Sequence, residues 1–329
     1  MGIQVTDLQL LRDQLLVRRE KLGAAIARSQ TASMVQLLEQ VDNALERVDT
    51  GDFGLCEHCH GTVEASRLLA DPLTRVCLDC LLPSEQRALE EDLALAARIQ
   101  DGLLPPRHMN AAGWQVSYHY EPARVVSGDY CDLIPHGNDL YFMLGDVSGK
   151  GVAASMLMAN LHATFRTLIP TGLPLPELVG RANRIFTEST LPSQYATLIV
   201  GRASACGAVE ISNGGHLPPF HVSRQGVSRL ESASVPVGMF HDQEFSSTRI
   251  EFSPGDSLVV YTDGFTETQG HGGAEYGWQR LAGLLQDHHG KSPRQVLEAC
   301  VDDLAAFVGA ARRIDDQTLM VLNFAPITH

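Results

Sequence analysis

The sequence predicts an α+β protein with two domains, and three observations support this class. Its 329 residues exceed the usual size of one small domain, and the 44% that are apolar can supply more than one core. In the carboxyl-terminal two thirds, strand-like segments precede and follow two long helical stretches, an order that favours layered sheets over a parallel doubly wound sheet. Near the amino terminus, two Cys-x2-Cys pairs indicate a small metal-stabilised module.

The overall composition excludes some classes of protein. The net charge of −14, from 25 basic and 39 acidic side chains, argues against binding nucleic acid over a broad surface, because phosphate contacts need clustered Lys and Arg. The first residues mix Asp7, Arg12 and Asp13 with leucines and lack the apolar core of a secretion signal. No apolar stretch approaches the roughly 18 residues that span a bilayer. We therefore expect a cytoplasmic protein without a membrane partner.

The first elements are two helices that form a hairpin. Apolar side chains recur with helical spacing in two stretches: Leu8, Leu11, Leu15, Leu22 and Ile26, then Val35, Leu38, Val41, Leu45 and Val48. A polar segment, Arg28 to Ser33, separates the stretches. This pattern predicts an antiparallel pair of helices.

A cysteine cluster follows the hairpin. Cys56 and Cys59 form one pair and Cys77 and Cys80 the other, with residues 60–76 between them. This spacing is typical of a structural zinc site with four thiolate ligands. Four of the seven cysteines lie in these pairs, which indicates metal binding in a reducing compartment rather than disulfides. We expect one Zn²⁺, with the neighbouring histidines at the surface.

A connecting helix is predicted next. Pro83 begins it, Ser84 is a candidate N-cap, and Pro105 ends it. Residues spaced by four and three positions form one seam along it: Leu89, Leu93, Ala96, Gln100 and Leu103. Two interpretations remain open at this point: the helix lies on the following domain, or it joins two copies of the chain as a parallel dimeric coil.

The remaining chain alternates strands and helices. Residues Gln115–Tyr120, Tyr195–Gly201 and Ser257–Tyr261 have strand patterns, whereas Gly151–Leu168 and Leu175–Thr190 have helical ones. Two strand-rich regions on either side of a helical pair predict an α+β layered domain.

Four aspartate-centred turns recur in this domain. They are Val126-Ser127-Gly128-Asp129, Gly145-Asp146-Val147-Ser148-Gly149-Lys150-Gly151, Tyr261-Thr262-Asp263-Gly264 and Asp315-Asp316-Gln317-Thr318. Apolar strand-like runs precede three of them, from Tyr118 to Val126, from Leu140 to Leu144 and from Ser257 to Tyr261. Carboxylate oxygens at strand ends are the ligands that Mg²⁺ and Mn²⁺ require, so these turns predict a metal cluster.

Both halves of the sequence resemble known families. The segment from Gly51 to Cys59, with Arg67-Leu68 and Cys77-Leu78-Asp79-Cys80, resembles the DksA/TraR zinc-finger family over residues 8–82. Members of that family insert an acidic coiled-coil tip into RNA polymerase, whereas the tip here, Ala27 to Met34, contains no acidic residue. The aspartate turns, with Asn213-Gly214-Gly215-His216 and Pro236-Val237-Gly238, resemble the SpoIIE/RsbU-like branch of the PPM protein phosphatases over residues 89–325.

The second resemblance implies a PPM-type β-sandwich flanked by helices, with two Mg²⁺ or Mn²⁺ at one end of the sheets. By position, Asp129 and Asp146 would be shared ligands assisted by the backbone carbonyl of Val147, and Asp263 and Asp315 would complete the set. Two cations about 3.5–4 Å apart neutralise a phosphomonoester and activate water, so water rather than a side chain would attack the phosphorus.

Other assignments in the site are less direct. Asp315 is preferred to Asp316 because the ligand of the family is the first member of this pair. Arg124 either binds the substrate phosphate through its planar guanidinium or forms a surface salt bridge. Asp132 is a candidate to orient the first aspartate, and His216 either protonates the leaving group or structures its loop.

These observations predict a serine/threonine phosphoprotein phosphatase regulated by its amino-terminal zinc module. The expected segments are residues 1–82 for the hairpin and zinc finger, 83–106 for the connecting helix and 107–329 for the phosphatase domain. By resemblance, the substrate is a small phosphorylated regulator such as an anti-sigma-factor antagonist of the STAS type. The alternatives are a pseudophosphatase scaffold and a regulator that associates with RNA polymerase.

Overall fold

The structure is a computed structural model, and it forms two compact units, Met1–Asp92 and Leu93–His329. It describes residues 5–27, 32–81, 83–191, 193–231, 234–270, 272–309 and 313–326. None of the helices in these ranges carries an apolar stretch long enough to cross a bilayer. Each unit is described by itself.

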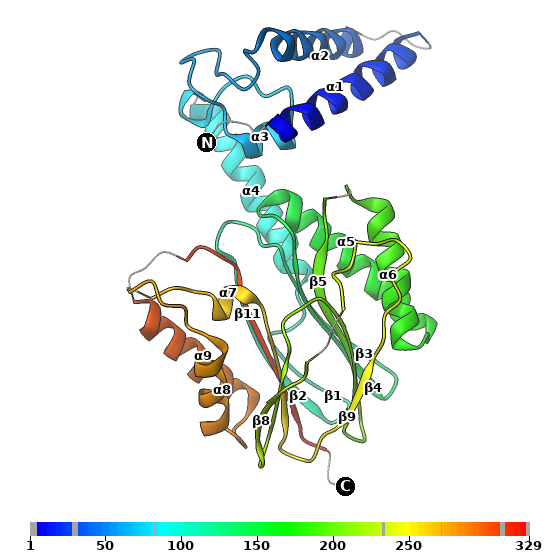
Figure 1. The fold of residues 1–329 in the computed structure, drawn as a ribbon, viewed down its shortest axis with the longest axis vertical. Helices are drawn as coiled ribbons and strands as arrows, with labels where there is room; N and C mark the ends of the chain where they lie inside the picture. Colours follow the sequence, from blue (N-terminus) through cyan, green and yellow to red (C-terminus); the bar gives the residue numbers. More distant parts are fainter. Residues whose placement is uncertain are drawn as a thin grey trace. The chain divides into compact units, whose positions relative to one another are not determined.

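The first unit begins with the predicted helical hairpin. Helices α1 (Val5–Ile26) and α2 (Ala32–Thr50) lie side by side (Figure 1). Ion pairs from Arg12 to Asp49 and from Arg19 to Asp42 show that the helices are antiparallel. The turn expected at residues 28–33 falls partly outside the described residues.

A small core joins the hairpin to the segment that carries the four cysteines, Cys56 to Cys80, which we call the knuckle. Buried Leu15 packs with Val41 and Leu45 between the helices, and buried Leu11 packs with Cys56 and Cys77. Helix α3 (Ala65–Ala70) and the short 3-10 helix η1 (Leu78–Cys80) complete this unit. The knuckle therefore shares apolar contacts with α1 as well as supplying its own thiols.

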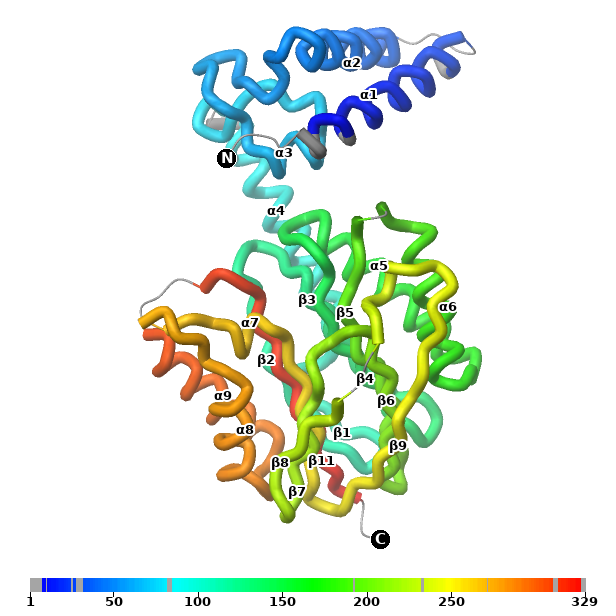
Figure 2. Tube along the Cα trace, in the orientation of Figure 1, coloured from blue at the N-terminus to red at the C-terminus, as the bar shows by residue number. Residues whose placement is uncertain are grey.

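Two antiparallel sheets form the second unit (Figure 2). The first sheet has the order β1-β2-β11-β10-β7-β8, with strands His108–Ala111, Trp114–Glu121, Gln317–Phe324, Ser257–Tyr261, Phe220–Ser223 and Gly226–Arg229. The second has the order β3-β4-β5-β6-β9, with strands Asp129–His136, Asp139–Val147, Ala196–Ser204, Ala208–Gly214 and Thr248–Glu251.

Helices cover the outer face of each sheet. The second unit contains α4 (Pro83–Leu103, from Leu93 onward), α5 (Val152–Leu168), η2 (Ile169–Thr171), α6 (Leu175–Ser189), α7 (Asp263–Thr266), α8 (Trp278–Asp287) and α9 (Pro293–Val308). Figure 1 shows α5 and α6 on one side of the sandwich and α8 and α9 on the other. This α-β-β-α arrangement confirms the predicted fold class.

Strand β4 shows why its sheet is covered on both faces. Leu140, Phe142 and Leu144 point into the core between the sheets, whereas Tyr141 and Met143 pack under α5 and α6. Because successive side chains of a strand point to opposite faces, an unbroken apolar run can be buried only when both faces are covered.

The structure corrects one predicted strand. The run from Tyr118 to Val126 was expected to continue to the first aspartate turn, but β2 ends at Glu121 and residues 122–128 form a loop. Asp129 is instead the first residue of β3, in the other sheet. The loop therefore carries the chain from one layer of the sandwich to the other.

Candidate metal centre

Asp129 and Asp146 lie directly opposite one another in the ladder between β3 and β4. The Asp129 side chain is buried, with 1% of the residue exposed. A Cβ atom at Gly128 would lie 3.2 Å from the carbonyl oxygen of Val147 and 3.5 Å from Oδ1 of Asp146. The Val147 carbonyl and the Asp146 carboxylate thus face the same glycine, beside the first aspartate.

Two threonine hydroxyls connect Asp129 to the other sheet. Thr262, which follows β10, donates to Oδ2 of Asp129 at 3.0 Å, and Thr318 of β11 donates to the same oxygen. Thr262 directly precedes Asp263, and Thr318 lies three residues after Asp315. These bonds therefore bring the third and fourth aspartate turns to the end of the sandwich that carries the first two.

The third turn packs against the fourth. Asp263 is the first residue of α7, and its Oδ1 accepts a hydrogen bond of 2.8 Å from the backbone N–H of Gly264. A Cβ atom at position 264 would lie 2.0 Å from the carbonyl oxygen of Asp316. Only glycine allows this close backbone approach, which fixes Asp263 beside the final aspartate pair.

Asp315 and Asp316 have different surroundings. Both carboxylate oxygens of Asp316 accept backbone hydrogen bonds from the 122–128 loop, from Ala123 at 2.7 Å and from Gly128 at 2.9 Å. The Asp315 carboxylate instead accepts a bond of 2.8 Å from Nζ of Lys150, at an exposed position. Asp316 is thus used in holding a loop, and Asp315 is the member of the pair that retains an accessible carboxylate.

Burial and repulsion between carboxylates raise the pKa values of three of these aspartates. Burial, and then the nearby Asp146, hold the pKa of Asp129 well above its usual range. Burial, followed by repulsion from Asp263 and Asp315, raises the pKa of Asp146 to about 7. Burial and Asp315 also raise the pKa of Asp263. Ionised carboxylates are therefore disfavoured here without a compensating charge.

This donor set fits hard divalent cations. Such ions bind carboxylate and carbonyl oxygens, and their charge would relieve the repulsion among the four aspartates. The carboxylate oxygens are less tightly gathered than the thiols, since within the described chain only the cysteine cluster has three or more ligand atoms all within 4.8 Å of one another. Adjustment of the aspartate side chains, including release of Asp315 by Lys150, would accompany binding.

Arg124 lies on the loop beside the aspartates, with its side chain exposed. Among the described residues Arg124 forms no ion pair, and its two predicted roles, binding of the substrate phosphate and a surface salt bridge, stay predictions.

Asp132 faces away from the aspartate cluster. It lies three positions after Asp129 on β3, and such residues point to opposite faces of a strand. Its buried carboxylate accepts two bonds from Arg166 of α5, at 2.7 and 3.0 Å. The expectation that Asp132 orients the first aspartate is therefore wrong; it anchors α5 to the sheet.

His216 structures its loop. Its Nε2–H donates to the carbonyl of Tyr261 at 3.0 Å, and its Nδ1 accepts from the hydroxyl of Thr197 at 2.8 Å. Burial lowers its pKa to about 4. With both ring nitrogens engaged and the neutral form favoured, His216 is not available as a proton donor. It ties β5 and β10 together instead.

Three residues that hold the site aspartates in place were not predicted from the sequence. Thr262 and Thr318 bind Asp129, and Lys150 pairs with Asp315. Each lies within a quoted motif, but the partners are separated by more than 130 positions. Sequence spacing alone carries no signal for such contacts.

The four cysteines of the first unit are gathered as predicted. Their sulfur atoms all lie within 4.8 Å of one another, and all four thiols are free. The backbone N–H of Cys77 lies 3.4 Å from Sγ of Cys56 and lowers the pKa of that thiol to about 6. A closed cluster of four sulfur atoms fits the tetrahedral shell of a structural Zn²⁺.

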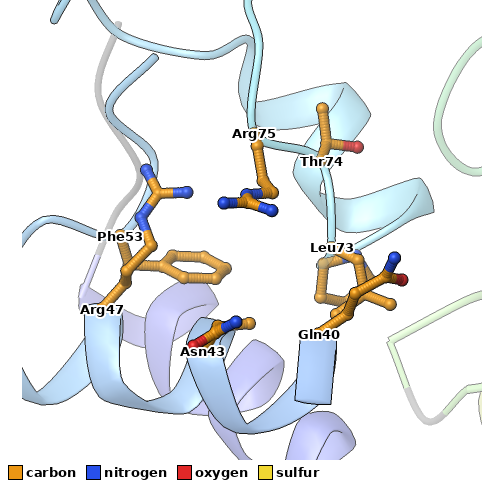
Figure 3. A pocket seen from close by; sticks show the side chains of 9 residues that line it. Gln40, Asn43, Arg47, Phe53, Leu73, Thr74 and Arg75 are labelled. Carbon is orange, nitrogen blue, oxygen red and sulfur yellow. The ribbon is translucent and has the colours of Figure 1, made fainter. Parts of the chain in front are cut away.

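A pocket beside the knuckle is explained by structural contacts. Figure 3 shows Arg47, Phe53 and Arg75 around it. Both arginines are already paired with Glu57, and Arg47 also donates to the carbonyl of Asp52 at 3.1 Å. These bonds fasten the knuckle to α2 and engage both guanidinium groups in structural contacts.

The sandwich is the fold of the PP2C-type phosphatases. The SiaA-PP2C domain of Pseudomonas aeruginosa matches with a TM-score of 0.65 and 20% identity, covering 74% of this chain and 100% of that one. The RsbU and RsbW domains of Rv1364c from Mycobacterium tuberculosis match with a TM-score of 0.58 and 25% identity, covering 68% and 63% of the two chains.

The family assignment rests on residues 136–325, which match Stage II sporulation protein E (SpoIIE). Because this match spans more than half of the chain, the protein belongs to the SpoIIE family. Residues 51–86 match the prokaryotic dksA/traR C4-type zinc finger.

Individual relatives agree with both matches. Phosphoserine phosphatase RsbU of Bacillus subtilis is 23% identical over 72% of this chain and 71% of its own length. Protein IcfG of Synechocystis is 26% identical over 70% of this chain, which spans only 41% of IcfG. The transcription factor DksA of Haemophilus influenzae is 35% identical over 52 residues.

Proposed function

We propose that this protein is a Mg²⁺- or Mn²⁺-dependent serine/threonine phosphoprotein phosphatase. The observation that carries the proposal is the convergence of Asp129, Asp146, Asp263 and Asp315 from both sheets at one end of the sandwich. Repulsion among these carboxylates makes the cluster suited to cations and unsuited to a phosphate ester by itself.

The residues of the site have distinct tasks in this reaction. The bound cations would neutralise the phosphate and activate a water molecule. The aspartates hold those cations, and the hydroxyls of Thr262 and Thr318 fix the Asp129 carboxylate. Exposed Arg124 binds the phosphate oxygens, and Lys150, once released from Asp315, adds a second positive charge.

Hydrolysis of p-nitrophenyl phosphate with Mn²⁺ tests this proposal. The Asp146→Asn variant should lose at least about a hundredfold in kcat/KM, because one shared ligand is removed. Asp302→Asn, which changes an exposed aspartate of α9, is the matched control and should retain activity. Absence of activity in the wild type, or activity that Asp146→Asn leaves unchanged, would contradict the proposal and favour a binding protein such as a pseudophosphatase scaffold.

The natural substrate in this proposal is a small phosphorylated regulator of the STAS anti-sigma-factor-antagonist type. Kinship with the phosphoserine phosphatases RsbU and RsbP supports a phosphoserine or phosphothreonine protein as the substrate. Mass spectrometry of STAS proteins from the same genome, phosphorylated and then treated with this enzyme, would identify the one that loses its phosphate. Retention of phosphate by all of them would exclude this substrate class.

Regulation by the zinc module acts through α4 in this proposal. Gln100 is buried, donates to the carbonyl of Ser127 at 2.8 Å and accepts from its N–H at 2.9 Å. Movement of α4 would thus displace the residue that precedes Gly128 and Asp129. Gln100→Leu should change Mn²⁺ affinity measured by calorimetry; an unchanged affinity would contradict this route.

The other face of α4 provides for a homodimer. Gln100 and Leu103 of the predicted seam pack on the sandwich, whereas Leu95 and Ile99 are 47% and 59% exposed. We assign these two residues to a contact with a second copy. If the wild type is a dimer in light scattering, Ile99→Lys should convert it to a monomer. A wild type that is already a monomer would contradict the proposed dimer contact.

The zinc-finger match supports a second candidate, a regulator that associates with RNA polymerase. Co-purification of polymerase with the full chain, lost in a Cys56→Ser variant, would favour this candidate. Retention of phosphatase activity in the same variant would separate the two functions.

A further inference from the structure

An apolar rim surrounds the aspartate end of the sandwich. We define it by large apolar side chains that are more than one third exposed in the segments around the cluster: Val125, Val152, Met156, Leu191, Tyr195 and Ile314. Met156 and Ile314 are the most exposed, at 68% and 65%. Figure 1 shows the starts of α5 and α7 and one end of β5 at the same end of the sandwich.

Hydrogen bonds tie rim residues to the site. Tyr195 exchanges two bonds with Ser148, two positions after Asp146: its carbonyl accepts from the Ser148 N–H at 2.8 Å and its N–H donates to the Ser148 hydroxyl at 2.9 Å. The carbonyl of Ile314 accepts from Lys150 at 3.2 Å. The rim is therefore continuous with the aspartate cluster and not a separate surface.

The α5 part of the rim forms one face. Val152 is the first residue of α5, and Met156 lies four positions later, so both side chains lie on the same side of the helix. Val125 belongs to the loop that Asp316 holds, and Ile314 lies two positions before Asp316. Apolar side chains thus stand on both sides of the acidic centre.

These side chains contribute little to the core in their exposed positions. Single exposed apolar residues are ordinary on protein surfaces, but a set gathered around one site marks a contact surface. A polypeptide substrate would extend well beyond its phosphate, because an extended chain advances about 3.3 Å per residue, and residues two to four positions from the phosphorylated residue lie about 7–13 Å away.

We propose that the rim binds apolar side chains flanking the phosphorylated residue of a protein substrate, with Met156 and Ile314 as its principal contacts. This inference rests on the proposed phosphatase function and adds the chemistry by which the substrate is selected. The ligand of the rim is a polypeptide whose phosphate binds at the aspartate cluster while its neighbouring apolar side chains are buried against the rim. The exposed, positively charged Arg124 lies next to Val125 and is complementary to the negative charge of that phosphate.

Three substrates test the inference on the full chain with Mn²⁺. They are p-nitrophenyl phosphate, a phosphoserine peptide with leucines at the positions two to four residues on either side, and the same peptide with serines in their place. Wild type should hydrolyse the leucine peptide with a kcat/KM at least about fivefold above that of the serine peptide.

Met156→Gln is the informative variant, because glutamine has a similar length and helix propensity. It should reduce kcat/KM about fivefold for the leucine peptide and leave p-nitrophenyl phosphate and the serine peptide unchanged. Trp278→Gln, at a 39% exposed position on α8, is the matched control and should preserve the leucine preference.

The outcomes separate this inference from the proposed function. Hydrolysis of p-nitrophenyl phosphate with no preference between the peptides would overturn the inference alone. An equal loss by Met156→Gln on all three substrates would also overturn it, because the residue would then support the site in general. A change from dimer to monomer in Met156→Gln would assign the rim to a second copy instead. Failure to hydrolyse any substrate would overturn the proposed function and the inference together.

Discussion

Replacing Asp146 by asparagine should stabilise the metal-free protein while removing its capacity to bind Mn²⁺. The carboxylate of Asp146 is repelled by Asp263 and Asp315 and receives no hydrogen bond from any described residue. Burial and this repulsion raise its pKa from 3.8 to about 7. Asparagine has nearly the same shape without the charge, so the substitution removes the repulsion and leaves the packing in place.

The magnitude follows from the pKa difference. Each pKa unit corresponds to about 1.4 kcal/mol, so a rise from 3.8 to about 7 gives an upper limit of about 4 kcal/mol. Partial exposure of Asp146 and relaxation of the other carboxylates reduce the expected gain to about 2 kcal/mol at pH 8. Because the pKa is raised in the folded state, the wild-type penalty grows as pH rises from about 4 to about 7, and it is complete above that range.

Urea unfolding without added Mg²⁺ or Mn²⁺ measures this effect. The free energy of unfolding of Asp146→Asn should exceed that of wild type at pH 8, and the difference should shrink at pH 5, where the folded wild type holds a proton on this group. Asp302→Asn should show neither change. A variant less stable than wild type at pH 8, or a gain equal at both pH values, would refute the electrostatic reasoning.

Three further variants test other parts of the structure. Cys77→Ser should unfold the zinc module, which would appear as a loss of helical circular dichroism. Chelation of zinc from the wild type should cause the same loss. A helical signal that persists in both experiments would exclude a structural zinc ion. Gly264→Ala should weaken Mn²⁺ binding about tenfold in calorimetry, because the methyl group of the alanine would clash with the backbone carbonyl of Asp316. An unchanged affinity would show that the two aspartate turns move apart without cost to the site. Arg166→Met should reduce the free energy of unfolding by about 3 kcal/mol, the low end for a buried pair, because the Arg166 side chain is 45% exposed and Asp132 would keep the Leu133 N–H and nearby His162 as partners. Adding Asp132→Asn should restore part of this loss, and no recovery would argue against this pair.

Much of the fold followed from local patterns in the sequence. Period-two and helical spacings predicted Ser257–Tyr261 as a strand and Leu175–Thr190 as a helix, and the structure has β10 and α6 at these positions. Cys-x2-Cys spacing predicted the sulfur cluster, because two thiols with two residues between them converge within a single turn of the chain.

The errors arose where the outcome depends on strand direction and sheet membership. Asp132 was grouped with Asp129 by its nearness in sequence, but their odd separation on β3 puts them on opposite faces. The run after Tyr118 was extended too far because apolar residues such as Val126 are buried in the loop as well as in the strand. The spacing of apolar residues does not predict where the chain passes from one sheet to the other.

The contacts of the 122–128 loop bear on how a signal would reach the site. Gln100 of α4 holds the loop at Ser127, and Asp316 holds it at Ala123 and Gly128. The last aspartate turn and helix α4 thus both hold this loop, which leads directly into Asp129. A signal in α4 would consequently act on the first and fourth motifs together, through hydrogen bonds already in place. Helix α5, which follows Asp146, is tied to β3 through Arg166 and Asp132, and Leu103 of α4 packs on the same core cluster as α5, so a movement of α4 would reach α5 as well as the loop.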